Sequence, residues 1–128
     1  MKRQMMSERR KILDGTYPSR IIRGRQNKHI AGTKEFAQNS EKMQRLNPGS
    51  KPSILEVDAQ ALVDKFRGTG VIEIKPGSLY PRETIDVGEV IGKTWVKSLG
   101  KYVDTRKVAI IYSSDGVHVF PVSDYRKR

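Results

Sequence analysis

Alternating apolar and polar positions in the second half of the chain predict β-strands. Runs rich in Val, Ile and Thr lie between turn-forming residues, at 71–75, 84–87, 91–96, 107–114 and 117–123. In the first run, Ile72 and Ile74 should share a face. An Asp115-Gly116 pair separates the last two runs and predicts a β-hairpin with a two-residue loop. The second half is therefore expected to form an antiparallel sheet that ends in a C-terminal hairpin.

Helices are predicted where apolar residues recur at helical spacing, at 7–13, 34–46 and between Asp58 and Gly68. Ser7 and Asp58 are the expected N-caps, and the Asn-Pro-Gly-Ser run at 47–50 ends the second helix. Residues 20–30 are interpreted as a basic loop or short strand. Helices followed by an antiparallel sheet predict an α+β fold.

A chain of 128 residues is long enough for one domain with one core. Residues 1–20 are expected to form a basic N-terminal helix and linker, and residues 21–128 the folded domain. The absence of cysteine excludes disulfides and thiolate metal ligands, and carboxylates show no ligand-like spacing around either histidine, so no metal site is expected. Neither a transmembrane span nor the apolar core of a signal peptide is present, so any export would depend on something outside this sequence.

The net charge of +11 and the pI near 10.1 favour a polyanionic partner. The charge is uneven, because residues 1–50 hold 12 of the 25 basic residues but only 4 of the 14 acidic ones. The N-terminal part is therefore the expected phosphate-facing surface. An anionic membrane is disfavoured, since no stretch combines a basic face with a long apolar stripe. Charge alone does not separate nucleic acid from an acidic protein as partner.

One of the two histidines, His29, lies among the cations Arg23, Arg25 and Lys28. Neighbouring positive charge lowers the pKa of an imidazole and keeps the ring neutral, as a general base must be. A surface histidine in a phosphate-binding loop would give the same pattern.

The other histidine, His118, lies in the C-terminal hairpin. With a two-residue loop, Ser113 should stand directly opposite His118 and on the same face. Thr105 has the same parity, whereas Tyr112 should point to the other face. The alternative is that His118 fills a half-buried strand position and Ser113 satisfies its hydrogen bonding.

Together the histidines match the requirements of one reaction. Cleavage of RNA through the neighbouring 2′-hydroxyl needs a base for that oxygen, an acid for the leaving 5′-oxygen, and cations for the phosphate oxygens. Because RNA carries its own nucleophile, neither a metal, a cofactor nor a Cys or Ser nucleophile is required. A basic chain with two histidines meets this minimum.

Competing constellations are weaker. Carboxylates near strand ends offer a base for a Glu–His pair, or form a solvated edge: Glu83, Asp86 and Glu89. The Gly68-Thr69-Gly70 run lacks the Gly-Lys-Ser/Thr element and the following helix of a phosphate loop. Aromatic residues that could stack on bases are Trp95, Tyr102 and Phe120. Of these, Trp95 and Phe120 are expected in the core.

Several runs resemble, in order, the polymorphic toxin type 50 domain. They are Gln26–Thr33 (QNKHIAGT), Lys51–Leu55 (KPSIL), Glu89–Gly92 (EVIG), and Thr105 followed by Ile110–Pro121 (IIYSSDGVHVFP). The resemblance extends from about Arg23 to Val122. It implies a predicted ribonuclease with a fold similar to barnase, EndoU, colicin nucleases and RelE, in which N-terminal helices pack on a twisted antiparallel sheet.

The resemblance also implies a context and a site. Such domains occur at the C-termini of bacterial toxins and of phage head-morphogenesis proteins, and toxin versions are expected to have an immunity protein, here an acidic one. The implied site residues are Lys28, His29, Thr105, Tyr112, Ser113 and His118. In the resulting hypothesis His29 is the base and His118 the acid. Lys28, Arg25 and Arg23 bind phosphate, while Ser113, Thr105 and Tyr112 orient the scissile group.

The expected activity is a metal-independent, toxin-type endoribonuclease that acts on RNA in the cytoplasm of a bacterial host or target cell, delivered by a secreted toxin or a phage particle. The first alternative is a nucleic-acid docking module of a phage head or larger toxin, which binds in a salt-sensitive manner without turnover. The second is a domain whose positive face meets an acidic protein.

Overall fold

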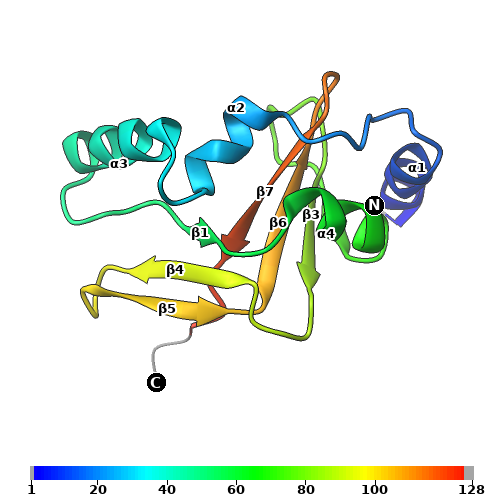
Figure 1. Ribbon diagram of the computed structural model, residues 1–128. Helices are drawn as coiled ribbons and strands as arrows, with labels where there is room; N and C mark the ends of the chain where they lie inside the picture. Colours follow the sequence, from blue (N-terminus) through cyan, green and yellow to red (C-terminus); the bar gives the residue numbers. More distant parts are fainter. Residues whose placement is uncertain (1, 126–128) are drawn as a thin grey trace.

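The strands form two antiparallel sheets. The computed structural model describes residues 2–125. The larger sheet has the order β2-β3-β6-β7, with β2 at Val71–Glu73, β3 at Arg82–Asp86, β6 at Lys107–Tyr112 and β7 at Val117–Val122. The smaller sheet has the order β1-β4-β5, with β1 at Ile54–Leu55, β4 at Gly92–Val96 and β5 at Lys101–Thr105. β7 contacts both β1 and β4, so it lies where the sheets meet (Figure 1).

Helices α1 (Lys2–Leu13), α2 (Arg23–Gln26), α3 (Lys34–Leu46) and α4 (Ala59–Phe66), with the 3₁₀ turn η1 (Asn27–His29), complete the described elements. The α+β prediction is confirmed. The bounds of α3 are those predicted, and the Asp58 side chain caps α4 by accepting a hydrogen bond from the Ala61 N–H. Ser7 is not a cap, because α1 begins at Lys2. The prediction of a loop or strand at 20–30 is wrong for 23–29, which forms two short helical turns.

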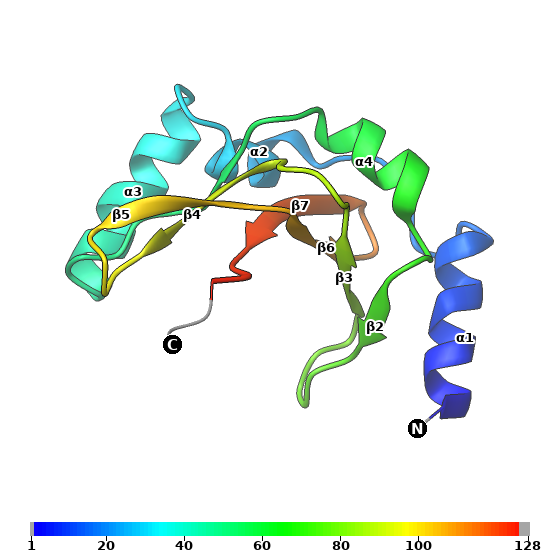
Figure 2. The same cartoon turned by 90° about the horizontal axis from the view of Figure 1, so that it is seen from below.

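One face of the larger sheet is the core face. Alternate residues of β6 and β7, among them Val108, Ile110 and Val119, are buried against Leu62 and Val63 of α4. Figure 2 shows α2 and α4 on this side, while the other side carries no helix in the described part of the chain. The period of two therefore sends the remaining side chains of β6 and β7 to the face that carries no helix among residues 2–125.

The C-terminal hairpin is present, but its loop is four residues long rather than two. Tyr112 pairs with Val117, which leaves 113–116 as the loop and places Ile111, not Ser113, opposite His118. The Ser113 hydroxyl accepts a hydrogen bond from the Asp115 N–H and donates one to the Gly116 carbonyl, which closes the longer turn. Because the register shift is two residues, the faces are unchanged, and Tyr112 and His118 lie on opposite sides as predicted.

Gly116 explains why the loop takes this form. Its φ is +146°, and a Cβ there would lie 2.3 Å from the Arg20 carbonyl oxygen. This close approach lets Val117 form a parallel bridge with Ile21, with the Val117 N–H donating to the Arg20 carbonyl. The N-terminal segment thus leads directly from the hairpin tip into α2.

Candidate functional site

The site is built where η1 passes the outer edge of β7. Gln26 is fully buried, and its amide donates to the Val119 carbonyl at 2.7 Å and accepts from the Val119 N–H at 2.7 Å. Because β7 is the last strand of its sheet, these bonds satisfy backbone groups that no further strand can reach. The contact fixes η1 beside the two residues that flank Val119, which are His118 and Phe120.

Both histidines lie against the Phe120 ring. The His29 ring is stacked on it with 5.1 Å between centroids, and the His118 ring is tilted against it at 6.0 Å. His118 and Phe120 stand two residues apart on the face of β7 that carries no described helix, while His29 is contributed by η1. The fold therefore brings together two imidazoles that are 89 positions apart in sequence.

Ser53 orients His29. The Nδ1 atom lies 3.2 Å from the Ser53 carbonyl oxygen and 3.0 Å from the Ser53 hydroxyl oxygen. When Nδ1 carries the proton and donates to the carbonyl, Nε2 is left to exchange a proton with a ligand. Burial lowers the pKa of His29, and the charge of Lys28 adds to this effect, whereas the Ser53 carbonyl raises the pKa by stabilising the imidazolium.

His118 has no such support. Burial, followed by the positive fields of His29, Arg25 and Lys28, lowers its pKa to about 4. Its Nδ1 atom is buried and has no hydrogen-bond partner. An imidazole in these surroundings is neutral at neutral pH, which is the form that a general base has before it accepts a proton.

Cations converge on the same region. Arg25 and Lys28 act on the pKa of His118 through their fields, and an Arg25 guanidinium nitrogen lies 3.5 Å from the Ser113 hydroxyl oxygen. Both cations are exposed, as is Arg23 on α2. The Ser113 hydroxyl is already hydrogen-bonded within its own turn, at the rim of the site.

Arg82 also lies on this face, although the sequence did not indicate it as a site residue. The β3–β6–β7 register places Arg82, Ile111 and His118 in one cross-strand row. The guanidinium carbon of Arg82 lies 5.6 Å from the Phe120 ring centroid, and its Nε atom is buried with no partner. The parity of β3 could have indicated Arg82, but only with the pairing register already known.

Two predicted site residues are buried and use their hydroxyl groups in internal hydrogen bonds. Tyr112 is buried on the core face, where its hydroxyl donates to Glu83 at 2.7 Å. The buried Thr105 ends β5, and its hydroxyl donates to the Val122 carbonyl at 2.7 Å and accepts from the Lys107 N–H. In both residues the hydroxyl is engaged in internal bonds, so the structure supports a role in folding.

Of the carboxylates in the alternative Glu–His pair, Glu83 is engaged in internal hydrogen bonds. Glu83 is fully buried on the core face, where it accepts hydrogen bonds from the Gly68 and Gly70 N–H groups as well as from Tyr112. Asp86 and Glu89 are exposed. Trp95 and Phe120, expected in the core, are instead half-buried and lie outside it.

Among residues 2–125, no group of three or more His, Asp or Glu side chains has an arrangement that could hold a metal ion. In the same part of the chain, no helix has the length and apolar character needed to cross a membrane. No curated protein matches the sequence. A family model described as bacterial toxin 50 matches residues 21–121.

The chain belongs to the bacterial toxin 50 family. The match covers most of the chain and includes both histidines, Gln26, Ser53 and Arg82. It confirms the resemblance identified in the sequence, and this chain carries a toxin domain. Helix α1 precedes the region that defines the toxin 50 domain, although Ile12 of α1 is part of the core.

Proposed function

We propose that this toxin 50 domain is an endoribonuclease that cleaves RNA by 2′-hydroxyl transesterification without a metal ion. The observation that supports this most strongly is the placement of His29 and His118 on one Phe120 ring within a field of cations. Two imidazoles on the same surface can supply the base and the acid that this reaction needs.

The pKa directions favour roles opposite to those expected from the sequence. His118 has a pKa of about 4 and no hydrogen-bond partner at Nδ1 to stabilise a protonated ring, so it is the less suited to be the acid and takes the role of base. His29 is the better acid, because the Ser53 carbonyl stabilises its protonated form. In the proposed reaction His118 takes the 2′-hydroxyl proton, and the 2′-oxygen attacks the adjacent phosphorus. The bond from phosphorus to the 5′-oxygen breaks, and His29 gives that oxygen a proton.

The products would be one fragment with a 2′,3′-cyclic phosphate and one with a free 5′-hydroxyl. Lys28, Arg25 and Arg82 would bind the non-bridging phosphate oxygens, where negative charge builds up in the transition state. A phosphodiester between the histidines would also offset the cationic fields that lower the pKa of each ring, so substrate binding itself would favour protonation of His29.

The first test is incubation of the purified domain with total RNA in EDTA, beside His29→Ala and His118→Ala variants. The expected result is fragments ending in 2′,3′-cyclic phosphate, greatly reduced with both variants. Cleavage that persists in both would disprove the histidine mechanism. Intact RNA bound in a salt-sensitive manner would instead establish a nucleic-acid docking module, the alternative function in a phage head or larger toxin.

A second test separates the two roles. A uridine 3′-(4-nitrophenyl phosphate) substrate has a leaving group that needs no proton, so loss of the acid should matter little. We expect His29→Ala to retain most activity on this substrate while losing activity on RNA, and His118→Ala to lose both. The reverse pattern would return His29 to the role of base.

The cellular setting follows as part of the same proposal. An RNA-cleaving toxin domain would act in the cytoplasm of the target cell, after delivery by a parent toxin or a phage particle. An immunity protein would protect the producer, and an acidic one would complement the net charge of +11. Such a protein should lose affinity when Arg25 and Lys28 are both replaced by Gln if it covers the proposed site.

A further inference from the structure

The segment 51–53 joins the proposed site to an aromatic pair on the smaller sheet. The Lys51 ammonium lies 4.6 Å from the Trp95 ring centroid. The Pro52 carbonyl accepts a hydrogen bond from the Tyr102 hydroxyl at 3.1 Å. Its serine is the residue that contacts His29. Consecutive Cα atoms are only about 3.8 Å apart. Because Pro52 and Ser53 are consecutive, the aromatic pair and His29 lie close enough for neighbouring nucleotides of one strand to contact both.

The aromatic pair is a cross-strand pair with cations around it. Trp95 on β4 and Tyr102 on β5 are direct partners, with ring centroids 5.1 Å apart and edge-to-face. Both are half-buried, so part of each ring reaches solvent. Lys93 on the same face of β4 lies 5.8 Å from the Tyr102 ring centroid and also 3.8 Å from a Glu56 carboxylate oxygen.

We infer that Trp95 and Tyr102 form a subsite for the base of an unpaired nucleotide next to the cleaved bond, an inference that rests on the proposed ribonuclease function. Partly exposed aromatic rings beside cations are an arrangement with which proteins bind single-stranded nucleic acid. A base stacked on Trp95 takes the place of the Lys51 ammonium, which is exposed and long enough to turn to the adjoining phosphate. Lys93 is the second cation of the subsite.

The chain has a single tryptophan, so its fluorescence reports on this subsite alone. The probe is a 2′-O-methyl RNA oligonucleotide, which lacks the nucleophile and stays intact. Titration should quench the Trp95 emission to saturation. Anisotropy of a labelled copy should show binding about tenfold weaker for Trp95→Leu, while Trp95→Phe, which keeps an aromatic ring, stays close to wild type.

Charge is tested with a matched pair of lysines. Lys51→Gln should weaken binding more than Lys65→Gln, since Lys65 is exposed on α4, away from the aromatic pair. Absence of quenching, or equal binding by wild type and a folded Trp95→Leu variant, overturns the subsite. These readouts do not need cleavage: quenching without any RNA cleavage would keep the subsite and refute the nuclease, and cleavage without quenching would do the opposite.

Discussion

The Gln26 side chain pairs with the backbone of Val119 as a further strand would, donating to its carbonyl and accepting from its N–H. This contact joins two parts of the family match that lie far apart in sequence. The residues after Gln26 lead to His29, and the neighbours of Val119 are His118 and Phe120. The geometry of the proposed site thus depends on one buried amide that takes no part in the chemistry.

Replacing Gln26 with Ala should destabilise the fold and reduce cleavage. Two buried backbone groups lose their partners, which predicts a loss of about 2–4 kcal/mol in the free energy of unfolding. Gln60→Ala is the matched control, because Gln60 accepts from the Ile21 N–H and donates to the Ser19 carbonyl on the segment before α2. Measured below the unfolding transition of each variant, kcat should fall in Gln26→Ala only; equal kcat values would show that Gln26 does not position His29.

Arg82→Met should reduce activity while leaving stability unchanged or raised. The buried Nε atom has no partner, so the guanidinium contributes little to folding, and methionine can still pack on Phe120. Because the variant loses a cation that would stabilise the negative charge of the transition state, we expect kcat to be about a hundredfold lower. Arg106→Met, at an exposed position, is the control for lost charge. A large drop in Tm with full kcat would make Arg82 a purely structural residue.

Tyr112→Phe should reduce stability while leaving activity unchanged. The variant removes the hydroxyl that donates to the buried Glu83 carboxylate on the core face, which predicts a loss of about 1–3 kcal/mol in stability. Because this hydroxyl points away from the histidines, kcat should stay near that of wild type. Urea unfolding and an RNA cleavage assay measure the two effects. A folded variant with little activity would restore Tyr112 to the catalytic group.

Local signals in the sequence were sufficient for much of the fold. Helix α3 and the Asp58-capped α4 have strong stop and start residues, and their limits follow from capping chemistry. β1 is too short, at two residues, to show a period. β5 was missed because its polar residues Lys101 and Asp104 obscure the alternation around Tyr102 and Val103. The division into two sheets is set by long-range pairing, which no local pattern encodes.

For the site, sequence identified the histidines and cations but not their arrangement. The loop length of the hairpin depends on the Ser113 hydroxyl and on the approach of Arg20 to Gly116, both of which are tertiary contacts. The predicted face of each side chain was still correct, because the register shifted by two residues. Gln26 could not be singled out, since a buried glutamine looks like an exposed one in sequence.

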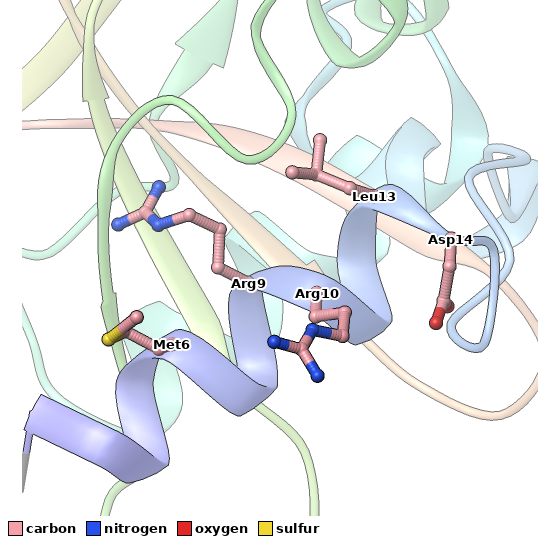
Figure 3. Close-up of a pocket in the computed structure, with 5 residues that line it drawn as sticks. All are labelled: Met6, Arg9, Arg10, Leu13 and Asp14. Carbon is pink, nitrogen blue, oxygen red and sulfur yellow. The ribbon is translucent and has the colours of Figure 1, made fainter.

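Helix α1 should be required for stability although it precedes the family match. Ile12 is fully buried, and the Arg9 guanidinium binds the Gly68 and Gly70 carbonyls. A hollow beside this helix is lined by Met6, Arg9, Arg10, Leu13 and Asp14 (Figure 3). Ile12→Ala should cost about 2–5 kcal/mol. Met6→Ala, at a side chain that is 66% exposed, should cost little; equal effects on Tm would mean that α1 is not docked.

Acidification should destabilise the domain through His118. Its pKa is lowered from 6.5 to about 4, so at intermediate pH the unfolded chain takes up a proton that the folded chain does not. Stability is therefore fully present above the ordinary histidine value and falls as the pH decreases through this window. His118→Gln cannot titrate, so its unfolding free energy should change less between the same pH values.

The same experiment tests the cause of the lowered pKa. Part of it comes from the fields of His29, Arg25 and Lys28, so Arg25→Gln should raise the pKa of His118 and shrink the loss of stability on acidification. Urea titrations of wild type and both variants across the window supply the slopes. Parallel slopes in all three would mean that His118 is not held neutral by burial and charge, and the assignment of His118 as the base would lose that support.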